Sequence, residues 1–138
     1  MANRMSIILF SGTVDKMMAA SVMASGGVMM GMNVDIFVTY YGLNSLLKEN
    51  VGTNTRFSKD FDEMAGPMMA MMKQKHMPSW YDTLKQAKEM GNVKIHGCTM
   101  TAELMGQKKE NYDPIIDDMV GVATFVDAAQ NSQVTLFI

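Results

Sequence analysis

Short, continuous apolar runs alternate along this chain with longer segments of helical period. Residues 6–10, 34–38 and 134–138 are the clearest runs. Runs of this length and composition are typical of strands buried on both faces of a parallel sheet. Weaker versions of the same pattern predict two more strands, at residues 93–96 and 118–121.

Between these strands the apolar residues recur every three or four positions, which predicts helices. Thr13 and Ser79 stand where an N-cap belongs. Gly31 lies near the end of the first helix, where a glycine readily takes a positive φ. The helices predicted in this way span residues 14–32, 43–48, 80–90, 99–106 and 123–131.

About five strands alternating with helices predict a single α/β domain over residues 1–138. Its sheet should be open and mostly parallel, with helices on both faces, because strand–helix–strand units of this length join parallel strands. Ligands of such sheets bind beyond the carboxyl ends of the strands. The turns at residues 11–13, 40–42 and 97–99 fall at that edge.

The segment 49–77 departs from the alternation. Its first part, residues 49–62, is polar and shows no clear period, and its second part is rich in methionine. Pro67 suits the first turn of a short helix there. Long connections in compact domains often serve as lids or oligomer contacts, and methionine repacks at little cost in either role. We interpret 49–77 as a Met-rich lid or oligomer-contact insertion.

Composition narrows the functional classes. The formal net charge of −2 offers no bulk attraction for nucleic acid, and the chain has neither a membrane-spanning run nor a signal-peptide pattern, so we expect a cytoplasmic protein. One cysteine forms no internal disulfide, and two histidines make no His-rich metal site; no metal is expected. Phosphate-binding glycine motifs are absent, so no cofactor is expected either.

Cys98 is the candidate reactive group. It directly follows a predicted strand and precedes a helix, where backbone N–H groups lower a thiol pKa. His96, two residues earlier, shares its face if the strand runs that far. The alternative is a buried, inert thiol, which is the commoner fate of a lone cysteine. The other candidates for a pocket or anion-binding role come from the three turns: Ser11, Gly12, Thr13, Tyr41, Gly42, Thr99, Met100 and Thr101.

The order and spacing of several segments resemble the DsrE/DsrF-like family of sulfur-relay proteins, and in particular its DsrE2-like subfamily. The matching segments are residues 7–12, 29–34, 36–43, 98–101 with 104–106, 121–125 and 134–138. The resemblance implies a Rossmann-like or flavodoxin-like three-layer domain and a homo-oligomer. It also implies that the cysteine at position 98 carries sulfane sulfur as a persulfide or thiosulfonate.

The resemblance further implies sulfur-donor and sulfur-acceptor proteins as partners, and small sulfur oxyanions as donors. Some family members use a second cysteine, which this chain lacks, so release must use an outside thiol or a second subunit. We therefore expect a sulfurtransferase or sulfur carrier acting through Cys98. Two other interpretations stay open: a non-catalytic oligomeric assembly module, and a nucleotide-binding or redox protein using the α/β crevice.

Overall fold

A five-stranded parallel sheet forms the centre of the computed structural model, which describes residues 3–138. The strands lie in the order β4-β3-β2-β1-β5, and every neighbouring pair is parallel. This confirms the predicted α/β class with a parallel sheet of five strands. The strand bounds are β1 Arg4–Leu9, β2 Asn33–Val38, β3 Val93–Cys98, β4 Asp118–Val120 and β5 Val134–Phe137.

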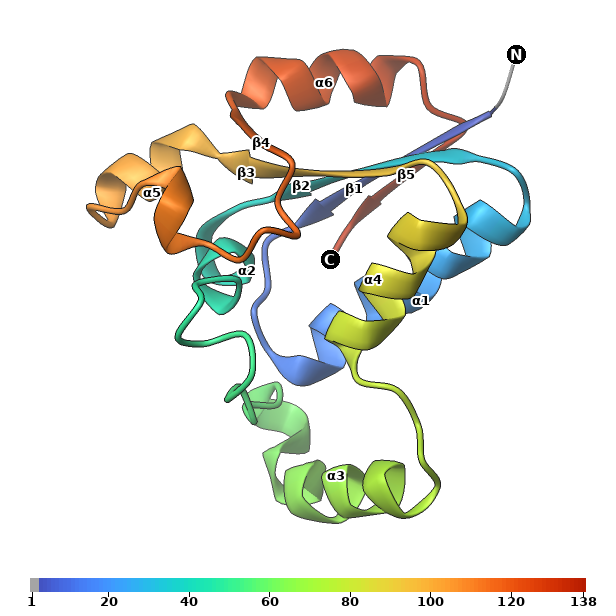
Figure 1. The fold of residues 1–138 in the computed structure, drawn as a ribbon, viewed down its shortest axis with the longest axis vertical. Helices are drawn as coiled ribbons and strands as arrows, with labels where there is room; N and C mark the ends of the chain where they lie inside the picture. Colours follow the sequence, from blue (N-terminus) through green and yellow to red (C-terminus); the bar gives the residue numbers. More distant parts are fainter. Residues whose placement is uncertain (1–2) are drawn as a thin grey trace.

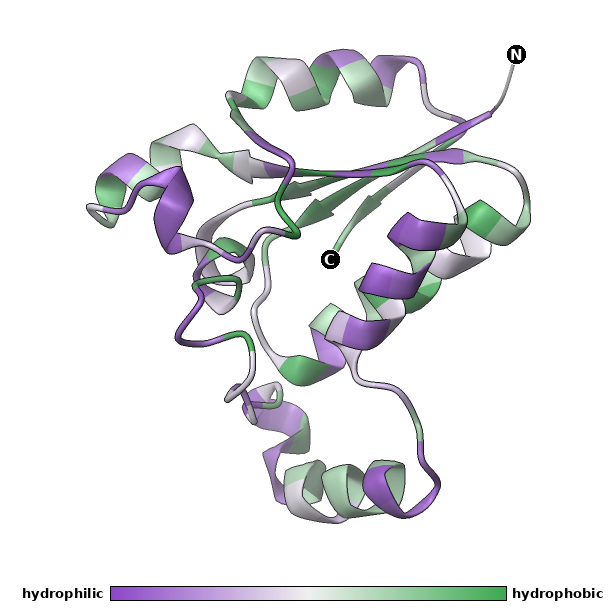
Figure 2. Ribbon diagram, in the orientation of Figure 1, coloured by the Kyte–Doolittle hydropathy of each residue, from purple (hydrophilic) through white to green (hydrophobic). Residues whose placement is uncertain are grey.

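Helices cover both faces of the sheet, as the alternation predicts (Figure 1). Helices α1 (Val14–Met29) and α4 (Trp80–Met90) pack side by side on one face, and α6 (Val122–Gln130) lies across the other. Along β1, for example, Met5, Ile7 and Leu9 are buried. Figure 2 shows the strands as mainly hydrophobic, while α4 carries hydrophilic residues on its outward turns.

Small residues let α1 approach its neighbours closely. A Cβ added to Gly27 would lie 2.9 Å from Cγ2 of Val34, so the glycine is required where α1 crosses β2. Ser21 donates its hydroxyl hydrogen to the carbonyl oxygen of Trp80, with 2.9 Å between the two oxygens, which joins α1 to α4. Beyond the end of α1, Gly31 has a φ of 74°, which confirms the predicted left-handed position.

The second helix begins earlier than predicted. α2 spans Tyr40–Ser45, whereas the apolar pattern predicted a turn at 39–42 and a helix at 43–48. The N–H groups of Gly42 and Leu43 both donate to the carbonyl oxygen of Thr39, so the helical turn forms directly at the end of β2. Gly42 must be a glycine, because a Cβ there would lie 2.5 Å from the carbonyl oxygen of Leu9.

The 49–77 connection contains a 3-10 helix, η1 (Lys59–Met64), and the short helix α3 (Ala65–Gln74) that Pro67 predicts. α3 contains no buried residue and packs mainly on η1. It projects from the end of the molecule opposite α6 and lies well away from α5 (Thr99–Leu104) (Figure 1). A lid closed over Cys98 is therefore not the arrangement of this structure, and the oligomer-contact interpretation stays a prediction.

Within residues 3–138, no helix combines the length and the apolarity that crossing a bilayer requires.

Candidate functional site around Cys98

Cys98 is the last residue of β3 and directly precedes α5, as its sequence position predicts. Only 3% of the residue is exposed, and it belongs to the main apolar core. Burial alone fits the inert-thiol interpretation. The polar groups around the sulfur decide between that interpretation and a functional thiol.

Two buried threonine hydroxyls lie beside Cys98. The Oγ1 atoms of Thr39, at the end of β2, and Thr101, in α5, lie 3.1 Å apart. The side chains of both threonines, and the backbone groups of Thr101 and Met100, act on Cys98 as hydrogen-bonding neighbours that lower the pKa of its thiol. The N–H of Tyr40 donates to Oγ1 of Thr101 at 3.2 Å. The Oγ1 atom of Thr101 thus contacts both the hydroxyl of Thr39 and the backbone N–H of Tyr40.

Burial and these neighbouring groups together set the acidity of the thiol. Burial raises the pKa of Cys98, but the side chains of Thr101 and Thr39 and the backbone groups of Thr101 and Met100 lower it, and the net shift is downward. Donors aimed at sulfur stabilise the thiolate and leave the neutral thiol unaffected. The site therefore favours the nucleophilic form of a thiol that is otherwise packed in the core.

Tyr40 is held in an unusual backbone conformation beside this network. Its φ of 45° lies in the left-handed region that favours glycine. Holding a non-glycine residue there costs about 1–3 kcal/mol and persists where surrounding contacts enforce it. The hydrogen bond from its N–H to Thr101 is one such contact.

Tyr112 contributes a phenol to the same region. The residue is 2% exposed, and its phenolic oxygen has no hydrogen-bond partner within residues 3–138. Burial raises the pKa of Tyr112, and the negative charge of the Cys98 thiolate raises it further. The phenol thus lies near enough to the sulfur for a thiolate charge to affect its pKa, and it makes no hydrogen bond to the sulfur.

His96 shares the β3 face with Cys98, as predicted, but its partners lie elsewhere. Nε2 is 2.9 Å from Oδ1 of Asp35 on β2, and Nδ1 is 2.6 Å from Oδ1 of Asp118 on β4. Arg4 adds a fourth charge, with Nε 3.5 Å from Oδ2 of Asp35. The hydrogen bond to Asp35 raises the pKa of His96, burial lowers it, and Asp118 raises it further; the net shift is upward.

His96 therefore belongs to a charged row across the sheet and is not among the groups that shift the pKa of Cys98. Both of its ring nitrogens face carboxylates, so neither has a lone pair free for a metal. In the part of the chain that the structure describes, no three His, Cys, Asp or Glu side chains are placed to hold a metal ion.

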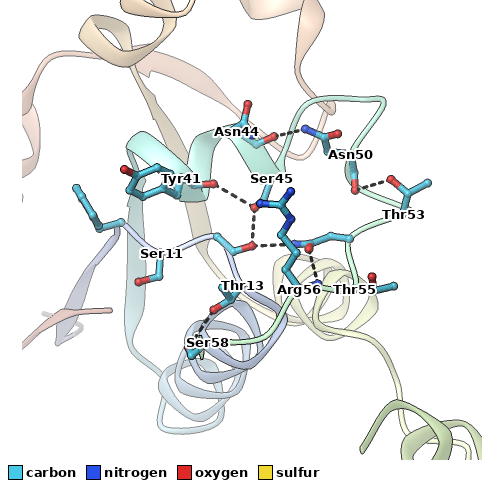
Figure 3. Close-up of a pocket in the computed structure, with 13 residues that line it drawn as sticks. Ser11, Thr13, Tyr41, Asn44, Ser45, Asn50, Thr53, Thr55, Arg56 and Ser58 are labelled. Atoms are coloured by element: carbon cyan, nitrogen blue, oxygen red, sulfur yellow. Dashed lines mark hydrogen bonds between the residues drawn. The ribbon is translucent and has the colours of Figure 1, made fainter. Parts of the chain in front are cut away.

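A polar cleft of about 620 Å³ opens at the carboxyl end of β1. Figure 3 shows its hydroxyl and amide groups together with Arg56. The carbonyl oxygen of Gly12 accepts from Oγ of Ser45 and Nδ2 of Asn54, both at 2.8 Å. The N–H of Val14, at the start of α1, donates to the carbonyl oxygen of Arg56 at 2.6 Å, so the chain itself occupies that helix terminus.

The structure divides the predicted site residues into separate groups. Ser11, Gly12, Thr13 and Tyr41 line the cleft, and Gly42 is buried beside them. Thr101 and the backbone of Met100 contact the sulfur of Cys98, which does not line the cleft. The remaining two residues lie outside both groups: Thr99 is exposed, and His96 is in the charged row.

Four functional candidates were not predicted: Thr39, Tyr112, Arg56 and Asn54. Thr39 ends an apolar strand, and that position alone could have marked it. The other three lie in polar connections without a pattern, and only the folded chain places them.

Three kinds of comparison bear on the chain: a family model, related sequences and solved structures. A sequence model of the DsrE/DsrF/DrsH-like family matches residues 1–70 and 55–137. The uncharacterized protein YrkE of Bacillus subtilis is 35% identical, covering 98% of this chain and 96% of its own. The sulfur carrier protein DsrE2 of Allochromatium vinosum is 27% identical, covering 98% of both chains.

A protein of unknown function from Methanobacterium thermoautotrophicum has a similar fold. Its solved structure superimposes with a TM-score of 0.56 at 12% identity and covers 99% of both chains. At this identity the likeness concerns the fold alone.

Proposed function

Because the chain belongs to the DsrE/DsrF/DrsH-like family, we propose that it carries sulfane sulfur on Cys98 and passes it to a partner protein. The observation that carries the proposal is the ring of donors around a sole cysteine: two threonine hydroxyls and two backbone groups that favour its thiolate. A thiol kept only for packing has no need of them. The sulfur carrier from Allochromatium vinosum, similar over nearly its whole length, supports the same chemistry.

Loading is a displacement at sulfur. With thiosulfate as donor, the Cys98 thiolate attacks the outer sulfur, the S–S bond of thiosulfate breaks, and sulfite leaves with the bonding electrons. Charge is conserved, and no external oxidant is needed. Tetrathionate would instead leave a thiosulfonate on Cys98 and release thiosulfate.

Unloading repeats the reaction in the opposite sense. An acceptor thiolate attacks the outer sulfur of the Cys98 persulfide, and the Cys98 thiolate leaves. The hydrogen bonds that stabilise this thiolate make it a better leaving group. Since the chain has one cysteine, the attacking thiol belongs to another molecule.

Access to the sulfur requires a local movement, because Cys98 is 3% exposed. We propose that the partner meets α5, the six-residue helix that follows Cys98. Its outer side chains Met100 and Leu104 are apolar and 60% and 70% exposed. We also propose that the protein acts in a reducing cytoplasm and that it self-associates. Light scattering of the purified chain tests the self-association, and a monomer at all concentrations would contradict it.

The mass of the intact protein tests the function directly. We expect incubation with thiosulfate, tetrathionate or polysulfide to add a sulfur-containing group that a simple thiol removes. Cys98→Ser should show no addition. Reversal by a thiol separates the adduct from methionine oxidation, since sulfoxides resist simple thiols. Absence of an adduct from every donor, or its persistence in Cys98→Ser, would refute the proposal.

A further inference from the structure

The phenol of Tyr112 is a buried donor without a partner, in a core where other polar groups are paired. It is the one buried side-chain polar atom in residues 3–138 that lacks a hydrogen-bond partner. Burying an unpaired hydroxyl costs about 1–3 kcal/mol, so natural cores rarely retain one without a use.

The position of Tyr112 is well defined. Its segment runs antiparallel to the chain just after α2, through a bridge between Tyr112 and Leu47. The N–H of Asp113 donates to the carbonyl oxygen of Leu46 at 2.8 Å, and the N–H of Lys48 donates to that of Asn111 at 3.1 Å. In Figure 1 this orange segment passes α2 on its way from α5 to β4. The phenol is therefore held in place by backbone contacts on both sides of Tyr112.

We propose that Tyr112 is a binding residue for the sulfur atom carried by Cys98: its phenol donates a hydrogen bond to the outer sulfur of the loaded state. This inference rests on the proposed function. In the unloaded state the phenol makes no hydrogen bond to Sγ. A sulfur bonded to Sγ lies about 2.05 Å beyond it and brings a new acceptor into the buried region.

Three observations support this role. Tyr112 and Cys98 belong to the same buried cluster. The Cys98 thiolate lies near enough to contribute to the raised pKa of the phenol. The groups that lower the pKa of Cys98 come from Thr39, Thr101 and the start of α5. The phenol is bonded to none of them and to no other group in residues 3–138, so it is a donor still available to an added atom.

Tyr112→Phe tests the inference, with Tyr81→Phe as the matched control. Tyr81 is the neighbouring tyrosine whose hydroxyl donates to Oδ1 of Asp113 at 2.9 Å. Tyr112→Phe removes an oxygen without a partner, so the unloaded variant should be at least as stable as the parent. Each protein is loaded with inorganic polysulfide, freed of donor, and followed by intact mass in dilute glutathione.

We expect Tyr112→Phe to lose its sulfur roughly ten-fold faster than the parent, the effect of one hydrogen bond to a charged atom. The pH midpoint for alkylating the loaded state should rise, while that for unloaded Cys98 stays unchanged. A purely structural role would move both midpoints. Tyr81→Phe should match the parent in the loss rate and in both midpoints.

The outcomes separate the two proposals. If the parent loads and Tyr112→Phe loses sulfur at the parental rate, the phenol does not contact the outer sulfur and this inference is overturned. A joint shift of both pH midpoints in Tyr112→Phe would overturn it as well. If the parent itself does not load, sulfur carriage fails, and the role of Tyr112 fails with it.

Discussion

The hydroxyl of Thr101 offers the most direct test of how the fold prepares Cys98. Thr101→Val replaces the hydroxyl by a methyl group of similar size and removes the first of the groups that lower the pKa of Cys98. A hydrogen bond to a charged group contributes about 1.5–3 kcal/mol. At about 1.4 kcal/mol per pKa unit, its loss should raise the pKa of Cys98 by about 1 to 2 units.

The assay is the pH dependence of Cys98 alkylation by iodoacetamide. Since only the thiolate reacts, the midpoint of the rate profile reports the thiol pKa, and the sole cysteine makes the signal unambiguous. Thr101→Ser keeps a hydroxyl and should retain the parental midpoint. Thr99→Val, in the same helix but exposed, should also leave it unchanged.

Thr101→Val should also lower the free energy of unfolding, by about 1–3 kcal/mol, because the N–H of Tyr40 loses its acceptor. Urea unfolding measures this separately from the thiol pKa. A Thr101→Val midpoint equal to that of Thr99→Val would show that the hydroxyl does not stabilise the thiolate. The account of Cys98 as an activated thiol would then be wrong.

Two further predictions concern stability. The pKa of His96 is raised above 6.5, so its contribution to stability is fully present below pH 6.5 and is lost as the pH rises through the folded-state value. His96→Gln should therefore be less stable than the parent at pH 6, by about 1.4 kcal/mol for each pH unit that separates the folded and unfolded pKa values. Urea unfolding should show this difference shrinking towards pH 9. Gly26→Ala should raise the free energy of unfolding by up to about 1 kcal/mol, because nothing lies within 4 Å of the new methyl group. Gly27→Ala should be less stable than Gly26→Ala, because its methyl group would collide with Val34. Equal thermal midpoints for the two variants would contradict the packing of α1 on β2.

The hydrophobic pattern was sufficient to predict the sheet and most helices. A short apolar run between helical segments, such as residues 34–38, is best buried as a strand inside a parallel sheet, so its secondary structure is predictable. α2 was predicted three residues late for a related reason. Leu43, Leu46 and Leu47 show the apolar spacing, but the helix begins at Tyr40, whose N–H donates to Thr101, a partner 61 residues away that the local pattern does not reveal.

The same contrast between local sequence patterns and contacts of distant segments explains which parts of the candidate site could be predicted. The position of Cys98 between β3 and α5 was predictable, because a strand–cysteine–helix order is local and visible in the sequence. The hydroxyl of Thr39 and the phenol of Tyr112 belong to positions far from Cys98 in the sequence. They come near it only because α2 packs on α5 and the chain just after α2 pairs with residues 111–113. The polar segment 49–58 likewise gave no signal that Arg56 would close the cleft beside Gly12.

The charged row across the sheet has a consequence for strand alignment. A shift of β3 by one residue would turn its apolar side chains to the wrong face, so hydrophobicity alone excludes it. A shift by two residues preserves the alternation, but it moves His96 about 6.6 Å along the strand, away from its direct neighbour Asp118. Two carboxylates and an imidazole on three adjacent strands therefore distinguish the native register from alignments that the apolar core would accept.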